Sequence, residues 1–163
     1  MRSRLILWLL AGLLFAAVAG VAVYKVRPLL NPQIDLLAAL DRECDLRAGP
    51  CSSELPGGGR ITFAIEPRSI PLLKPLQLQV DVEGVPVESV AVDFVGIGME
   101  MGFNRPKLTA LSTGRFTGEG MLPVCVRDAM EWEARVLVQS EQGLAAAPYR
   151  FITVKPGAEA PDQ

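Results

Sequence analysis

Most of the sulfur in this chain of 163 residues is concentrated in two short stretches. Four of the five methionines and one of the three cysteines lie between residues 99 and 130. Side chains two apart on an extended backbone point to the same side, so we expect the Met99 and Met101 sulfurs to face one way. Thioethers and thiolates are soft donors, which select Cu(I) over Zn²⁺ or Mg²⁺. The candidate Cu(I) ligands are Met99, Met101, Met121, Cys125 and Met130.

The chain contains no histidine. This excludes a Ser-His-Asp or Cys-His triad, a zinc site built on imidazole and a blue-copper site. The carboxylates form no recognisable acid–base pair, so we do not expect an enzyme. A Met/Cys shell is then the only soft metal site that the chain can build. The alternative is plain packing, because methionine is a flexible core filler and a free cysteine is commonly buried.

The elements that must position these residues are β-strands. From residue 60 onward apolar residues recur at every second position, as from Leu76 to Val82, which is typical of strands with one buried face. The spacing predicts an all-β fold, an immunoglobulin-like antiparallel β-sandwich of about seven strands over residues 60–155, with Trp132 in its core. The predicted strands are 61–66, 76–83, 88–96, 106–111, 115–121, 131–139 and 148–154.

The order of these strands also places the methionines. In a sandwich with short connections, successive loops alternate between its two ends. The loops after residues 96 and 121 therefore share one end, and the chain enters the domain at the other. This arrangement predicts that the candidate sulfur ligands converge.

An apolar segment precedes the sandwich. Leu5 to Tyr24 carries no charge, and a helix of that length crosses the roughly 30 Å hydrocarbon core of a bilayer. We interpret residues 1–27 as a transmembrane anchor with a cytoplasmic N-terminus. The alternative is a signal peptide cleaved after Ala17-Val18-Ala19. In a Gram-negative bacterium the first interpretation gives a single-pass inner-membrane protein with a periplasmic C-terminal domain, and the second a secreted periplasmic protein.

Three cysteines allow one internal bridge with one thiol left over. Of the three possible pairings, Cys44–Cys51 is favoured because Gly49-Pro50 supplies a turn between them. Such a bridge would be a structural staple, and it fits an exported domain.

The remaining segments complete the predicted organisation. Residues 28–59 are expected to form a juxtamembrane helix at 32–43 followed by the cysteine loop, because Asn31-Pro32 is a good helix start. The polar tail, residues 156–163, is expected to be disordered. Beyond residue 30 the chain carries 12 basic against 18 acidic residues, a formal charge of −6. An acidic body argues against a nucleic-acid partner.

Three short motifs resemble the YtkA-like and FixH-like group of small membrane-anchored β-sandwich domains. They are Gly98-Met99-Glu100-Met101, Gly114-Arg115-Phe116 and the run from Met130 to Val136. The resemblance implies a periplasmic accessory role in copper handling or in assembly of haem–copper oxidases. It carries over to Met99 and Met101 as ligands and to Trp132 as a core residue. The histidine that is often found beside the methionine pair in this group is missing here. Cys125 therefore becomes a more important candidate ligand.

Two functional hypotheses follow. The first is a membrane-anchored domain that binds Cu(I) through methionine and cysteine and exchanges it with a copper-handling protein. The second is a structural or interaction module that docks onto an inner-membrane complex through a methionine-rich end. Both place the N-terminal helix in the lipid bilayer.

Overall fold

The computed structural model describes residues 2–30, 32–124, 127–155 and 157. The chain divides into two compact units, Met1–Gln33 and Ile34–Gln163. The first unit contains helix α1, Arg2–Leu30. Within it, Ile6–Arg27 is long and apolar enough to cross a membrane. A helix of this kind at the N-terminus serves as a membrane anchor or as a signal sequence. The helix continues to Leu30, beyond the anchor predicted at residues 1–27.

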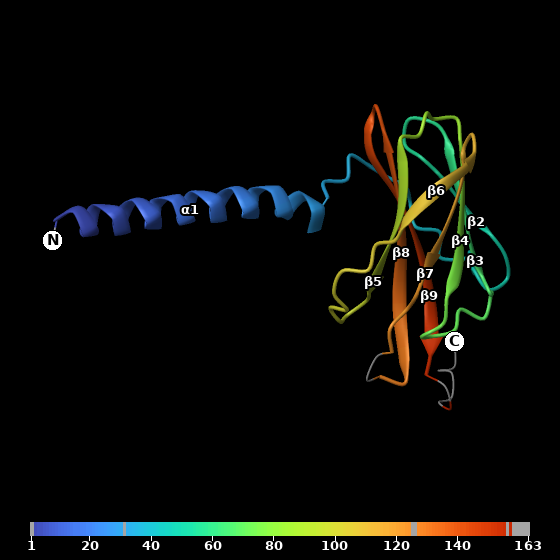
Figure 1. Cartoon of the computed structure of the whole chain (residues 1–163). Coiled ribbons are helices and arrows are strands. Elements are labelled where there is room, and N and C mark those ends of the chain that lie inside the picture. Colours follow the sequence, from blue (N-terminus) through green and yellow to red (C-terminus); the bar gives the residue numbers. More distant parts are fainter. Residues whose placement is uncertain (1, 31, 125–126, 156, 158–163) are drawn as a thin grey trace. The chain divides into compact units, whose positions relative to one another are not determined.

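The described residues of the second unit form nine strands in one mixed sheet (Figure 1). The sheet order is β1-β9-β8-β5-β6-β7-β4-β3-β2. The strands are β1 (Leu36–Leu37), β2 (Cys51–Glu54), β3 (Arg60–Glu66), β4 (Leu76–Glu83), β5 (Ser89–Gly96), β6 (Lys107–Ser112), β7 (Arg115–Gly120), β8 (Ala129–Ser140) and β9 (Gly143–Val154).

Strand β6 is the element about which the sheet curls. Its first residues pair with β5, where Leu108 lies opposite Val90, and its later residues pair with β7, where Thr109 lies opposite Thr117. Figure 1 shows β6 running obliquely between the two groups of strands. The result is a half-barrel with the apolar faces inside. The predominantly β fold is therefore confirmed, but the two separate sheets of a sandwich are not, and nine strands replace about seven.

The predicted helix at residues 32–43 is wrong. Leu36 and Leu37 instead form β1, which pairs in parallel with Ala145 and Ala146 of β9. The backbone amide of Asp35 donates to the Leu144 carbonyl at 2.9 Å, and the Asp35 carboxylate accepts from the Leu144 amide at 2.8 Å. An isolated helix of this length is marginal in water, whereas the edge of β9 offers hydrogen-bond partners directly.

The core lies between the facing parts of the half-barrel. Trp132, predicted as a core residue, is fully buried, and its Nε1–H donates to Thr153 Oγ1 at 2.9 Å. Across the interior the ring centroids of Phe63 and Tyr149 lie 5.4 Å apart. The Tyr149 hydroxyl donates to the Ile61 carbonyl at 3.0 Å, which joins β9 to β3. These contacts connect the two groups of strands through the interior.

We expect Tyr149 to make the domain alkali-sensitive. Burial raises the pKa of Tyr149 from about 10 to about 12, so the folded state holds the phenol neutral while the unfolded chain ionises it. This contribution to stability is complete below pH 10 and is lost as the pH rises from about 10 to about 12. Urea unfolding across that range should show a steeper loss for the wild type than for Tyr149→Phe. Parallel curves for the two proteins would contradict this role of Tyr149.

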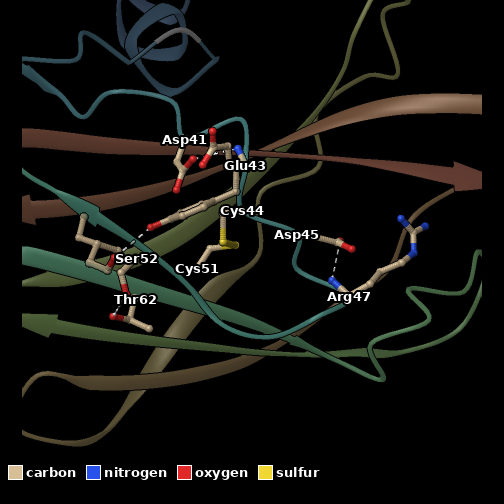
Figure 2. Close-up of a disulfide and its surroundings, with 10 residues drawn as sticks. Asp41, Glu43, Cys44, Asp45, Arg47, Cys51, Ser52 and Thr62 are labelled. Carbon is tan, nitrogen blue, oxygen red and sulfur yellow. Dashed lines mark hydrogen bonds between the residues drawn. A yellow bond between two sulfur atoms is a disulfide. The ribbon is translucent and has the colours of Figure 1, made fainter. Parts of the chain in front are cut away.

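A disulfide joins Cys44 to Cys51, with their Cα atoms 5.8 Å apart, so the favoured pairing is the one that forms. We call residues 38–50, which connect β1 to β2, the strap. Figure 2 shows the bridge with Asp45 and Arg47 on one side and the pair Ser52 and Thr62 on the other. Because β1 and β2 are the two terminal strands of the sheet, the strap connects the two ends of the half-barrel.

Candidate functional site

The two methionine-bearing loops lie at the same end of the half-barrel. Gly96, the last residue of β5, lies opposite Trp132 near the start of β8, and the Ile97 amide donates to the Glu131 carbonyl at 2.9 Å. The Asn104 side-chain amide in turn donates to the Met121 carbonyl at 2.9 Å. We call this end, formed by residues 97–106, 120–124 and 127–131, the methionine end. The prediction that these loops share one end is confirmed.

Two methionine side chains meet over Gly96. A Cβ atom added to this glycine would lie 2.5 Å from Met130 Cε and 2.8 Å from Met101 Cγ, closer than real Cβ contacts allow. It would also lie 2.8 Å from the Met99 carbonyl oxygen. The space above Gly96 is therefore occupied by the Met101 and Met130 side chains. Glycine at this position permits the close approach.

The four methionines differ in exposure. Met130 is buried, with 3% of its surface accessible, while Met99 and Met101 are half-buried and pack against the core cluster. Glu100 between them is exposed, which is the alternation expected of an extended stretch. Met121 is 47% exposed and joins the loop of Met101 through its backbone carbonyl. The methionine end thus offers thioethers from the core outward to solvent.

The structure brings together only part of the predicted ligand set. Met101 and Met130 converge, and the Met99 backbone lies beside them. Met121 belongs to the same end of the half-barrel. The contact that places it there is made by its backbone carbonyl, which accepts a hydrogen bond from Asn104. Cys125, the one thiol outside the disulfide, lies outside the described residues.

An ion pair that the sequence did not indicate positions the first loop. Arg105 Nη2 lies 2.9 Å from Asp93 Oδ2, and both side chains are only 13% exposed. The Arg105 guanidinium also lies over the Phe103 ring, 5.0 Å from its centroid. The Phe94 amide donates to the Asn104 carbonyl at 2.9 Å, which fixes the returning chain against β5. The signal that could have indicated this pair is Asp93, a carboxylate that alternates with the buried Val92 and Phe94 along β5.

A second charged cluster lies on β8 and β9, next to the methionine end. Burial alone would raise the pKa of Glu133, but hydrogen bonds from Arg135 at 2.6 Å and Arg150 at 3.0 Å outweigh it and hold the pKa below its ordinary value. Glu133 therefore stays ionised and neutralises the arginines beside it. Arg150 also lies 3.4 Å from Glu131. The two arginines and two glutamates of this cluster therefore form ion pairs with one another.

Thioethers are the donor set that the described residues bring together. Residues 2–30, 32–124, 127–155 and 157 contain no group of three or more His, Cys, Asp and Glu side chains able to hold a metal ion. Met101 and Met130 are neutral soft donors, suited to Cu(I) or Ag(I) and poorly suited to Mg²⁺ or Ca²⁺. The donor chemistry fits a soft monovalent cation.

The same end exposes apolar side chains. Phe103 is 63% and Val124 is 40% exposed, and Leu73 is 61% exposed. The Leu73 amide donates to the Leu122 carbonyl at 2.9 Å, so the loop between β3 and β4 reaches the loop that follows β7. Met121 adds a further exposed apolar side chain at this end.

Comparison with known proteins gives no relative from which a function could be transferred. No family model, curated protein or solved structure matches the chain.

Proposed function

We propose that this chain is a membrane-anchored, exported accessory protein that binds Cu(I) through the thioethers of Met101 and Met130. Met99, Met121 and Cys125 are further candidate ligands. The observation that carries the proposal is the convergence of the Met101 and Met130 side chains over Gly96. Two thioethers from distant parts of the chain meet at a position where glycine leaves room for them.

The chemistry of this pair suits a soft ion. Each thioether offers a polarisable lone pair without adding charge, which suits a monovalent soft cation. Met130 is buried and Met101 is half-buried, so an ion bound between them would be partly withdrawn from water. Cu(I) bound in this way would be cargo or a resident ion, and the protein's part would be to select and hold it.

The proposed location rests on the helix and the disulfide. Disulfides persist in oxidising compartments, and the apolar N-terminal helix supplies either an anchor or an export signal. The chain enters the second unit beside Leu144, whereas Met130 lies opposite Thr153 near the other end of β9. The ligands and the point of chain entry are therefore at opposite ends of this strand.

We also propose that the half-barrel is a variant of the immunoglobulin-like β-sandwich. The change of partner within β6 divides the sheet into two groups of strands whose apolar faces pack on each other. This topology and the methionine motifs support an accessory role in copper handling or in assembly of haem–copper oxidases, as in the YtkA-like and FixH-like group. The missing histidine makes thioethers the main donors in this proposal.

Metal titration tests the proposal. The full-length protein in detergent, with its free thiol kept reduced, is titrated with Cu(I) against a competing Cu(I) chelator. We expect removal of one equivalent of copper from the chelator per chain. Zn²⁺ and Mg²⁺ at the same concentrations should not compete. Failure to withdraw copper from the chelator would overturn the proposal.

The exposed apolar side chains of the methionine end favour a second candidate function, docking onto an inner-membrane complex. Phe103 and Met121 would be the main contacts, because both are large, apolar and exposed. Co-purification of a defined partner should then be lost in Phe103→Ser. It should persist in Leu111→Ser, which removes an equally exposed side chain from the opposite end of β6. Dependence of the association on Cu(I) would favour the copper function instead.

A further inference from the structure

The strap covers a free edge of the sheet. Beyond its short pairing with β1, strand β9 has no further partner strand on its outer side among the described residues. The Ala38 amide donates to the Ala146 carbonyl at 2.8 Å, and farther along β9 the Arg47 guanidinium donates to the Ile152 carbonyl. Leu46, next to Arg47, is fully buried. The strap therefore satisfies backbone groups that another strand would satisfy in a closed barrel.

The disulfide fixes the part of the strap that makes this contact. Arg47 lies inside the short loop closed by Cys44 and Cys51, and its backbone amide donates a hydrogen bond to Asp45 Oδ1 at 2.9 Å. The Ala48 carbonyl accepts from Arg68 at 3.0 Å, which ties the loop to the chain after β3 (Figure 2 shows Arg47 beside the bridge). The bridge thus limits how far Arg47 can move from β9.

The segment of β9 that Arg47 contacts is also the one that positions Met130. Ile152 lies opposite Glu131, and Thr153 lies opposite Met130. Thr153 Oγ1 accepts from Trp132 Nε1, so this segment is joined to the core as well as to β8. A continuous set of contacts therefore runs from the bridge through Arg47 and Ile152 to the backbone of Met130.

We propose that the Cys44–Cys51 bridge is a thiol-sensitive latch that controls how firmly β9 holds Met130. The part of the proposal that concerns metal affinity rests on the proposed Cu(I) function. A thiolate of a dithiol reductant attacks Sγ of Cys44, the more accessible cysteine, and the S–S bond breaks with Cys51 leaving as a thiolate. The second thiol of the reductant resolves the mixed disulfide, so the reductant becomes a disulfide and the protein gains two thiols. Arg47 is then free to leave Ile152.

Hydrogen exchange measures the latch without any metal. Full-length protein in detergent is compared before and after treatment with dithiothreitol. We expect the Phe151 and Thr153 amides to exchange about tenfold faster after reduction. The amides of Val136 and Val138, in the part of β8 remote from the contact between Arg47 and Ile152, should be unchanged. Unchanged exchange at Thr153, or an equal rise everywhere, would overturn the latch.

Arg47→Ala tests the same contact with the bridge intact. It should reproduce the faster exchange of Phe151 and Thr153 without reduction. The matched control is Arg60→Ala, which removes a guanidinium paired with Glu54 on the exposed face of β2 and β3 and should change nothing on β9. Normal exchange in Arg47→Ala would show that Arg47 does not transmit the state of the bridge, and would overturn the proposal.

The effect on metal affinity is measured with Ag(I), which resembles Cu(I) and does not oxidise in air. The double variant Cys44→Ser/Cys51→Ser avoids a thiol reductant that would itself bind silver. We expect its silver affinity to be about fivefold lower than that of the wild type, because Met130 is less firmly held. Faster exchange with unchanged silver affinity would overturn the link to Met130. Absence of silver binding in the wild type would count against the proposed function, while the exchange data would still decide the latch.

Discussion

Replacement of Trp132 by alanine is expected to lower the free energy of unfolding by about 4 kcal/mol. The indole is fully buried in the core, and the surrounding strands cannot close over the space it would leave. Its Nε1–H donates to Thr153 Oγ1, and Thr153 is 2% exposed, so the hydroxyl would lose a partner that water cannot readily replace. Urea unfolding of the full-length protein in detergent, followed by circular dichroism, measures the change.

Two further variants separate the causes of this loss. Trp132→Phe keeps much of the apolar volume and removes the donor, so it should cost about 1–2 kcal/mol. Trp8→Ala removes an exposed tryptophan from α1 and should leave unfolding of the second unit unchanged. A loss below about 1 kcal/mol in Trp132→Ala would show that this residue does not anchor the core.

The double variant Met101→Leu/Met130→Leu is expected to lose at least about a hundredfold in Cu(I) affinity. Even changes in residues that only support metal ligands cost 10- to 100-fold, and this variant removes two proposed ligands. Leucine replaces methionine at nearly equal volume, so each substitution should cost less than about 1.5 kcal/mol of stability. Competition against a Cu(I) chelator measures the affinity, and circular dichroism verifies the fold.

Met121→Leu is the matched single-thioether control. Met121 lies at the same end but is exposed, and its described contact is through the backbone. We expect it to lose less than tenfold in affinity, because the converging pair stays intact. Equal losses of Cu(I) affinity in the two proteins would show that the binding site is not centred on the pair over Gly96. Wild-type affinity in the double variant would show that Met101 and Met130 are not ligands.

Strands whose residues alternate in polarity could be predicted well from the sequence. In β4, Leu76, Leu78, Val80 and Val82 are buried and the residues between them are mostly exposed, so one periodicity determined both the strand and its inner face. The first half of β9 gave no such signal. Ala145, Ala146 and Ala147 are all buried, and alanine has little preference for strands, so only the tertiary pairing with β8 and β1 makes this segment a strand.

The short terminal strands were missed for a related reason. Leu36 and Leu37 lay within the helix predicted for residues 32–43, and the deciding factor was the edge of β9, far away in the sequence. Strand β2 begins at Cys51 within what was interpreted as a loop, and it forms by pairing with β3. Elements of two and four residues are too short for a periodicity to show.

The sequence was enough to predict which loops form the candidate site, but not which side chains within those loops touch. The order of the strands was enough to place Met101 and Met130 at one end. Their meeting over Gly96 depends on how the β5 backbone passes Met130, which no local pattern contains. Arg105 illustrates the same limit, because its pairing with Asp93 depends on the return of the loop along β5.

The short terminal strands also bear on how neighbouring copies behave. An open strand edge lets neighbouring copies of a β-domain join edge to edge into fibres when they are crowded. Here one outermost strand has two residues, and the other has four and lies between Pro50 and Pro56. Neither offers enough consecutive backbone groups for another copy to extend the sheet. We therefore expect that crowded copies do not associate through these two strands.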